Sequence, residues 1–180
     1  MQKTCRWICL SGAALVGAAA ALAVPTTNAD TVMRQIGLKV GQWHTIIRIT
    51  AAEAVPATQG GEVSPRLQGE LRRKVGTFYE TDDCVATRAG SNGNLILPGI
   101  NIGGECPLSN VRATKSNLRV DAVCGSASSG FQARTSVQAV IAGAAMNAHV
   151  QISTFSREAG VTTHLTLSTA SNYTGPCRLR

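Results

Sequence analysis

The chain has 180 residues, a formal net charge of +7 and only 4% aromatic residues. This length predicts one domain with a substantial hydrophobic core. The basic residues are scattered apart from Arg72–Lys74, and the few aromatic side chains offer no stacking platform for single strands, so we expect no nucleic-acid binding.

The first 29 residues have the order of a secretory signal peptide. Lys3 and Arg6 give a positive start, residues 10–24 are almost all small or apolar, and a Thr-Asn-Ala segment ends at Ala29. The apolar run is shorter than the ~20 residues that a membrane-spanning helix needs. We therefore expect cleavage after Ala29, with Ala23 as the alternative, and a soluble periplasmic product that does not span the membrane.

Four of the six cysteines follow the expected cleavage site. They are Cys84, Cys106, Cys124 and Cys177. Removal of 29 of the 180 residues leaves 151, and the 17 basic residues fall to 15 against 10 acidic ones. An even number of cysteines behind an export signal predicts two disulfides. Structural zinc sites usually use close cysteine pairs, whereas at least 17 residues separate successive cysteines here, so disulfides are favoured over a metal.

The first half of the mature chain shows one clear strand. Residues 40–50 alternate with period two, and Trp43 lies on the apolar face. Residues 51–65 contain two prolines and a Gly-Gly pair and predict a loop. Ser64 and Pro65 then predict the start of a short helix towards Arg73. Residues 75–81 predict a second strand, and the Gly- and Asn-rich residues 88–105 an irregular connection.

The second half predicts a meander of antiparallel hairpins. Alternating segments cover residues 108–114, 118–124, 131–141, 146–153 and 161–167, with turn residues between them. Residues 137–148 also fit a helical stripe, but the period-two pattern extends beyond Gly143 on both sides and favours strands. We expect an all-β fold, as a curved sheet, open barrel or sandwich, with at most one short helix.

The turn at residues 115–117 also bears on the disulfide pairing. A hairpin centred on Lys115 places Cys106 directly opposite Cys124, whereas a centre at Ser116 moves them one diagonal step apart. Only the first register allows a bridge without backbone movement. This register predicts a Cys106–Cys124 disulfide, which leaves Cys84 to pair with Cys177.

Short motifs in the same order resemble a known family. Residues 40–43 read Val-Gly-Gln-Trp, similar to an opening Pro-Gly-x-Trp strand, and residues 175–177 read Gly-Pro-Cys, similar to a closing Gly-x-Cys. Cys84 follows the second strand, and Cys106 and Cys124 flank a short hairpin. Over residues 36–178 the chain thus resembles the exported bacterial family catalogued as domain of unknown function 3617.

Two segments depart from that family's pattern. The loop after the first strand contains no Met, and Ala86-Thr87 stands where the family usually has Thr-Pro. The resemblance implies export and a disulfide-bonded β domain. It implies no activity.

The sequence contains no recognisable catalytic, cofactor or metal site. His44, His149 and His164 each lie on the polar face of a predicted strand, where a shared metal site is conceivable, but the hairpin turn places His164 opposite Ser153. Asp82 and Asp83 form the only adjacent carboxylate pair, and a solvated strand end explains them. The serines at 126, 128 and 129 lack the flanking glycine of a nucleophile elbow.

Three functions remain open. The favoured one is a monomeric, non-catalytic module that binds an apolar or amphipathic ligand or an envelope partner, because the apolar strand faces need a cover. Among the apolar residues to be covered are Trp43, Ile47, Ile49, Val150, Ile152, Leu165 and Leu167. The alternatives are an enzyme with an unrecognised site and a purely structural or interaction protein of the cell envelope.

Overall fold

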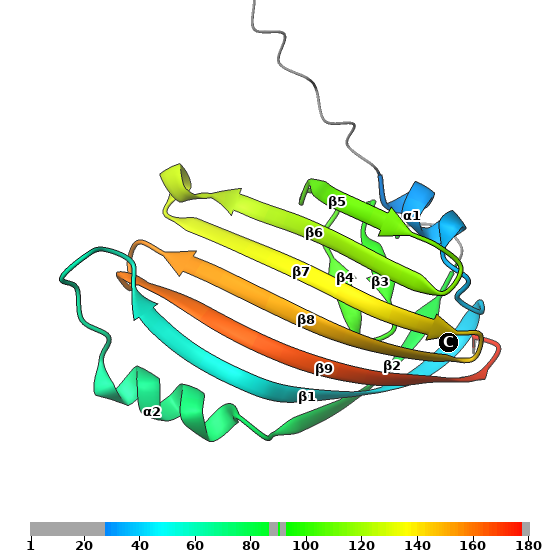
Figure 1. The fold of residues 1–180 in the computed structure, drawn as a ribbon, viewed down its shortest axis with the longest axis horizontal. Helices are drawn as coiled ribbons and strands as arrows, with labels where there is room; N and C mark the ends of the chain where they lie inside the picture. Colours follow the sequence, from blue (N-terminus) through cyan, green and yellow to red (C-terminus); the bar gives the residue numbers. More distant parts are fainter. Residues whose placement is uncertain (1–27, 87–89, 91–92, 178–180) are drawn as a thin grey trace, which may run out of the picture.

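Seven antiparallel strands form one curved sheet that does not close on itself (Figure 1). The computed structural model describes residues 28–86, 90 and 93–177. The strand order is β2-β1-β9-β8-β7-β6-β5, so β2 and β5 are the edges. The strands are β1 (Gly41–Pro56), β2 (Phe78–Val85), β5 (Leu108–Ala113), β6 (Asn117–Ser126), β7 (Phe131–Ala142), β8 (Ala145–Ser156) and β9 (Val161–Gly175). The all-β prediction is confirmed.

The second half of the chain is the expected meander. Strands β5 to β9 pair with their sequence neighbours, and β7 meets β8 across a turn in which Gly143 has a φ of 60°. A positive φ is easily adopted by glycine, which explains the tight turn at this position. The helical alternative for residues 137–148 is therefore excluded, because these residues belong to two paired strands.

Strand β1 extends further than the sequence pattern predicted. Residues 51–56, which were expected to be a loop, continue the strand and pair with β9 as far as Pro56. A β-bulge between Ile49 and Ala51 shifts the register. The bulge breaks the period-two alternation of side chains, and so the sequence pattern did not predict the second half of the strand.

The structure has two α-helices where at most one was expected. Helix α2 (Pro65–Lys74) begins as predicted, since Ser64 Oγ accepts a hydrogen bond of 3.1 Å from Leu67 N–H. Helix α1 (Ala29–Gln35) was missed. Its seven residues are too few for a helical period to stand out, yet Val32 is fully buried in the core.

A small hairpin occupies the segment that was predicted to be irregular. Strands β3 (Leu95–Leu97) and β4 (Ile100–Ile102) pair across a Pro98-Gly99 turn in which Gly99 has a φ of 72°. A Cβ atom on Gly99 would lie 2.5 Å from Thr45 Cγ2, so the turn packs against the main sheet. The Pro-Gly pair between two short apolar runs was a turn signal that the sequence analysis did not use.

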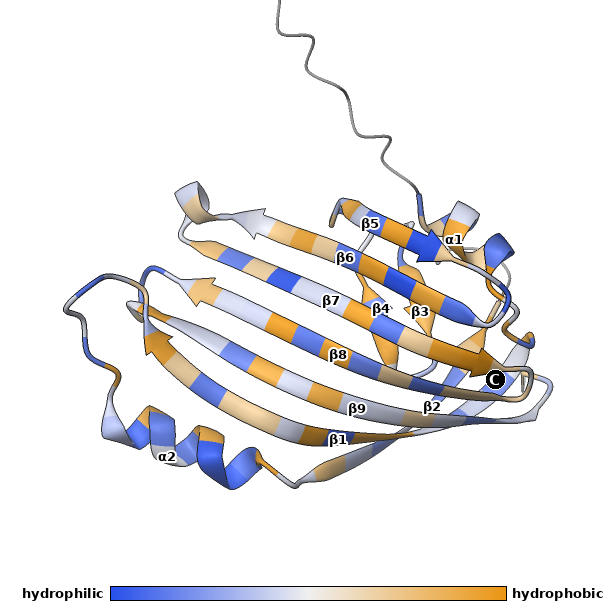
Figure 2. Cartoon of the chain, in the orientation of Figure 1, coloured by the Kyte–Doolittle hydropathy of each residue, from blue (hydrophilic) through white to orange (hydrophobic). Residues whose placement is uncertain are grey.

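The hairpin and α1 cover one face of the sheet, which we call the inner face. The chain leaves the edge strand β2, crosses this face as the hairpin and enters the other edge strand β5, behind the sheet in the view of Figure 1. Trp43, Val120 and Val137 are fully buried on the inner face. The opposite side, the outer face, carries the alternate residues of each strand, and the alternation of hydropathy along the strands is visible in Figure 2.

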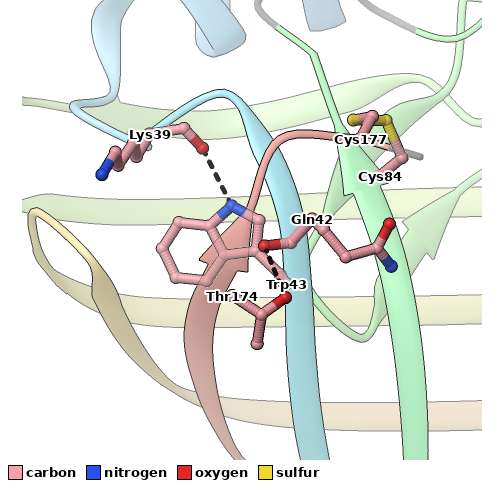
Figure 3. Close-up of a disulfide and its surroundings, with 6 residues drawn as sticks. All are labelled: Lys39, Gln42, Trp43, Cys84, Thr174 and Cys177. Atoms are coloured by element: carbon pink, nitrogen blue, oxygen red, sulfur yellow. Dashed lines mark hydrogen bonds between the residues drawn. A yellow bond between two sulfur atoms is a disulfide. The ribbon is translucent and has the colours of Figure 1, made fainter.

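Two disulfides join the cysteine pairs that the sequence analysis expected. Cys106 and Cys124 have Cα atoms 4.5 Å apart, and those of Cys84 and Cys177 are 5.5 Å apart. The second bridge ties β2 to the residues just after β9, next to Gln42, which pairs with Cys84 (Figure 3). The neighbouring Trp43 Nε1–H donates to the Lys39 carbonyl oxygen at 2.8 Å. This bridge therefore fastens the C-terminal strand to the edge of the sheet.

The first disulfide depends on a local register. Leu108 pairs with Ala122, as expected for a hairpin centred on Lys115, but a bulge follows Ser109. Beyond the bulge Ala113 pairs with Leu118, so the turn itself is centred between Lys115 and Ser116. The expected register thus holds next to the cysteines and not at the turn.

Candidate functional site

The three histidines lie on the outer face, as the sequence predicted, but in separate cross-strand rows. His164 pairs with Ser153, and His149 pairs with Ser168. His44 lies on β1 with its Nδ1 atom 3.0 Å from Asp82 Oδ1. Within the described ranges no three His, Cys, Asp or Glu side chains are grouped as metal ligands would be.

The carboxylates of Asp82 and Asp83 do not act as a pair. Successive residues of a strand point to opposite faces, so Asp82 joins His44 on the outer face and Asp83 turns inward. Asp83 Oδ2 accepts a hydrogen bond of 2.8 Å from Gly99 N–H and so fixes the tip of the hairpin. Its role is structural.

The serines at the far end of the sheet form a local turn. Ser126 Oγ accepts a hydrogen bond of 3.2 Å from the backbone N–H of Ser129 and caps the 3₁₀ turn η1 (Ala127–Ser129). Ser126 and Ser128 share a hydroxyl contact of 2.8 Å. The three serines therefore form the hydrogen bonds that hold this turn.

The apolar inner face is largely covered by the chain itself. Trp43, Ile49 and Val150 are buried, and a pocket of about 250 Å³ remains between the β3–β4 hairpin and the sheet. Ile152 and Leu167, which are half-buried, line this pocket. Its volume is below the roughly 300–1,000 Å³ that ligand pockets usually have.

A larger hollow opens on the outer face. Its volume is about 880 Å³, which is within the usual range for a ligand site. Strands β1, β9, β8, β7 and β6 form its floor, and β5 with the turn after it forms one side. Its lining residues include Ile46, Arg48, Arg112, Asn117, Arg119, Gln138, Val140, Asn147, His149, Ser168 and Ala170. We call it the outer hollow.

One row of paired residues crosses the whole sheet through the outer hollow. Taken from edge to edge, it is Phe78, Arg48, Ser168, His149, Gln138, Arg119 and Arg112. Directly paired residues share a face, so all seven side chains lie on the outer face. We call the three arginines of this row, Arg48, Arg119 and Arg112, the cationic row. At ~4.8 Å between neighbouring strands, it spans about 24 Å from β1 to β5.

A second row, two residues further along each strand, supplies apolar surface. Ile46, Ala170, Asn147 and Val140 are paired in that order across β1, β9, β8 and β7. Ile46 is 43% exposed and Val140 is 59% exposed. The outer hollow therefore places exposed apolar side chains directly beside positively charged ones.

The outer hollow has no acidic residue among its lining residues. In the described part of the chain, Arg48, Arg112 and Arg119 form no ion pair within 4.0 Å. Asp121 is the nearest acid along β6. Burial opposes its ionisation, but hydrogen bonds from Asn110 and Ser136 and the charge of Arg119 hold the pKa of Asp121 below its usual range.

The sequence analysis missed this site for a specific reason. Arg48, Arg119 and His149 stand at polar positions of predicted strands, so their exposure was expected. Their alignment depends on the pairing of β1 with β9, which joins distant parts of the chain, and the pattern within a strand carries no information on that pairing.

Comparisons of the chain with models of protein families, with curated proteins and with solved structures gave no match. In the ranges that the structure describes, no helix is long and apolar enough to cross a lipid bilayer.

Proposed function

We propose that the protein is an exported, non-catalytic binding module that holds an amphipathic ligand with an anionic group in the outer hollow. The observation that carries this proposal is the cationic row beside an exposed apolar row. A carboxylate, phosphate or sulfate group would contact the arginines, and an apolar part would cover Ile46 and Val140.

The arginines fit this chemistry. The guanidinium group presents a planar set of donors that matches carboxylate and phosphate oxygens in two-point hydrogen bonds. Arg112 and Arg119 are direct cross-strand neighbours, and like charges in this position destabilise a sheet unless a counter-ion is present. A bound anion between them would remove that repulsion.

The hydrophobic neighbours distinguish an amphiphile from a simple anion. Ile46 and Val140 are among the exposed large apolar residues, and both line the outer hollow. Covering such surface releases roughly 25 cal/mol for each Å² of apolar area. A ligand with both an anionic and an apolar part therefore gains binding free energy from contacts with both rows.

Export to the periplasm belongs to the same proposal. The charged start and apolar run of residues 1–29 support a cleaved signal peptide, and two disulfides fit an oxidising compartment. The resemblance to the domain of unknown function 3617 supports the same location and adds no activity. We propose that the mature protein acts as a monomer.

A titration with matched probes tests the binding proposal. We expect a fluorescent fatty acid to bind saturably, and the corresponding alcohol with the same chain to bind at least about tenfold more weakly, because only the acid pairs with the arginines. An Arg112→Gln/Arg119→Gln variant should weaken binding of the acid and leave binding of the alcohol unchanged.

The matched control removes two charges elsewhere. Arg34 lies on α1 and Arg66 on α2, outside the outer hollow. An Arg34→Gln/Arg66→Gln variant should therefore bind the fatty acid as the parent chain does. Equal binding of acid and alcohol, or equal loss in both double variants, would contradict the proposal.

A further inference from the structure

A second surface combines positive charge with exposed aromatic residues. Arg72, Arg73 and Lys74 end α2, and Val75, Phe78 and Tyr79 follow within five residues. Every residue from 72 to 80 is exposed. Phe78 is 66% exposed, Tyr79 50% and Val75 43%. We call residues 72–79 the basic–aromatic corner.

The backbone holds this corner in place. Leu71 is the one buried residue of α2, so the helix touches the domain through a narrow contact. After the helix, Gly76 N–H donates to the Ile49 carbonyl oxygen at 2.8 Å, and Ile49 N–H donates to the Thr77 carbonyl oxygen at 3.0 Å. These bonds anchor the turn to β1 below the sheet in the view of Figure 1. The apolar side chains are therefore displayed on an ordered support.

The charges of the corner are not neutralised within the described residues. Residues 72–79 contain no acid, and neither Arg72, Arg73 nor Lys74 forms an ion pair there. Glu70, two to four residues before these cations on the same helix, is paired with Arg66 at 3.0 Å. The hydropathy colouring shows the polar character of α2 beside the more apolar start of β2 (Figure 2).

We propose that the basic–aromatic corner docks on the surface of a bilayer that contains anionic phospholipid. Basic side chains are attracted to the negative surface potential of such a bilayer, and the attraction falls off within a Debye length. Exposed aromatic and aliphatic residues insert between the head groups and add apolar burial. Three cations next to Val75 and Phe78 match both parts of this surface, whereas Tyr79, which pairs with Ile47, points to the opposite face of β2.

This proposal does not depend on the ligand of the outer hollow. Arg112 and Arg119 lie on β5 and β6, at the other edge of the sheet from β2. A variant of each surface can therefore be compared with the same vesicles.

The test is co-sedimentation of the mature protein with vesicles. Vesicles of phosphatidylglycerol and phosphatidylcholine should bind the protein, and vesicles of phosphatidylcholine alone should bind it at least about tenfold less. The Arg72→Gln/Arg73→Gln/Lys74→Gln variant should lose at least about tenfold in binding to the anionic vesicles. Added salt should weaken binding of the parent chain and have little effect on the residual binding of this variant.

A second variant separates docking on lipid from attraction to any polyanion. Phe78→Ser keeps all three cations and should also weaken vesicle binding severalfold, while leaving unchanged any weak binding to dextran sulfate, a soluble polyanion. Arg34→Gln removes a charge on α1, outside the corner and the outer hollow, and should bind vesicles as the parent chain does. Circular dichroism and the unfolding temperature confirm that each variant folds.

Three results would overturn the proposal. Equal binding to anionic and neutral vesicles would exclude recognition of charge, and unchanged binding of the triple variant would exclude the corner. Full retention of vesicle binding by Phe78→Ser, together with tight binding of dextran sulfate, would assign the corner to a soluble polyanion instead.

Discussion

Arg112 and Arg119 face each other directly across β5 and β6 on the outer face of the sheet. Both side chains are exposed, and no acid lies within ion-pair distance of either in the described ranges. Such a pair of like charges lowers stability in the absence of a counter-ion. Under the proposed function, an anion bound between the two arginines would therefore stabilise the protein.

The first prediction follows from this pair. Arg112→Gln should raise the free energy of unfolding of the ligand-free protein by about 0.2–1 kcal/mol at low salt, because it removes the repulsion from Arg119. Arg112 is the better choice of the two, since Arg119 also interacts favourably with Asp121. Urea unfolding measures the change, and Arg34→Gln serves as the control. A loss of stability in the Arg112 variant at low salt would contradict the inferred repulsion.

The second prediction concerns a buried hydroxyl group. Thr169 is 4% exposed, and its Oγ1 atom has no hydrogen-bond partner among the described residues. Valine has nearly the same shape and no polar atom to leave unsatisfied. Thr169→Val should therefore stabilise the protein by about 1 kcal/mol, since an unmade buried hydrogen bond costs about 1–3 kcal/mol.

Thr45 provides the matched control for this change. It is also fully buried, but its Oγ1–H donates to Ser171 Oγ at 2.9 Å. Thr45→Val should destabilise the protein, because it leaves the Ser171 hydroxyl without its partner. If both variants shifted the urea midpoint in the same direction, the difference in hydrogen bonding between the two threonines would not explain the result.

The third prediction concerns the pH dependence of stability. The native pKa of Asp121 is lowered by hydrogen bonds and by Arg119 despite burial, so its stabilising effect is present above the pKa of about 3.9 in the unfolded chain. The effect disappears as the pH falls through the lower native value. Asp121→Asn should therefore lower stability at pH 7, and the difference from the parent chain should vanish in acid.

The free energy of unfolding, measured at several pH values, checks the direction of the pKa shift of Asp121. Glu62 is an exposed carboxylate in the loop before α2, away from the hydrogen bonds of Asp121. Glu62→Gln is the control that converts a carboxylate to an amide without touching the hydrogen bonds of Asp121. A difference between Asp121→Asn and the parent chain that grew on acidification would contradict the lowered pKa.

The sequence predicted the parts of the fold that depend on local patterns. The period-two alternation placed the strands of the meander, and the Ser64-Pro65 pair placed the start of α2. The parts that were missed have physical causes. A bulge after Ile49 interrupted the alternation of β1, and α1 is too short to show a helical period.

The outer hollow could not be predicted because it depends on non-local pairing. Arg48 and Arg119 of the cationic row are 71 positions apart in the sequence, and only the sheet order aligns them. The sequence pattern predicted a ligand on the apolar faces of the strands. The hairpin and α1 cover much of that face, and the larger hollow lies on the polar side.

The last prediction concerns the N-terminus of the mature protein. Asn28 caps α1, since its Oδ1 atom accepts hydrogen bonds from Thr31 N–H at 2.9 Å and from Thr31 Oγ1 at 2.8 Å. Ala29 is 6% exposed and belongs to the core. Cleavage after Ala29 would remove both residues, and loss of a helix cap alone costs about 1 kcal/mol.

Cleavage at the alternative site, after Ala23, keeps the cap and the buried alanine. Under the proposed export, we therefore expect the mature protein to begin at Val24, and N-terminal sequencing of periplasmic material measures this directly. Two recombinant chains provide the energetic test. The chain that begins at Asp30 should unfold at a lower urea concentration than the chain that begins at Val24, because α1 then lacks its cap and part of its contact with the core. A periplasmic protein that begins at Asp30, with two equally stable recombinant chains, would show that α1 does not need these residues.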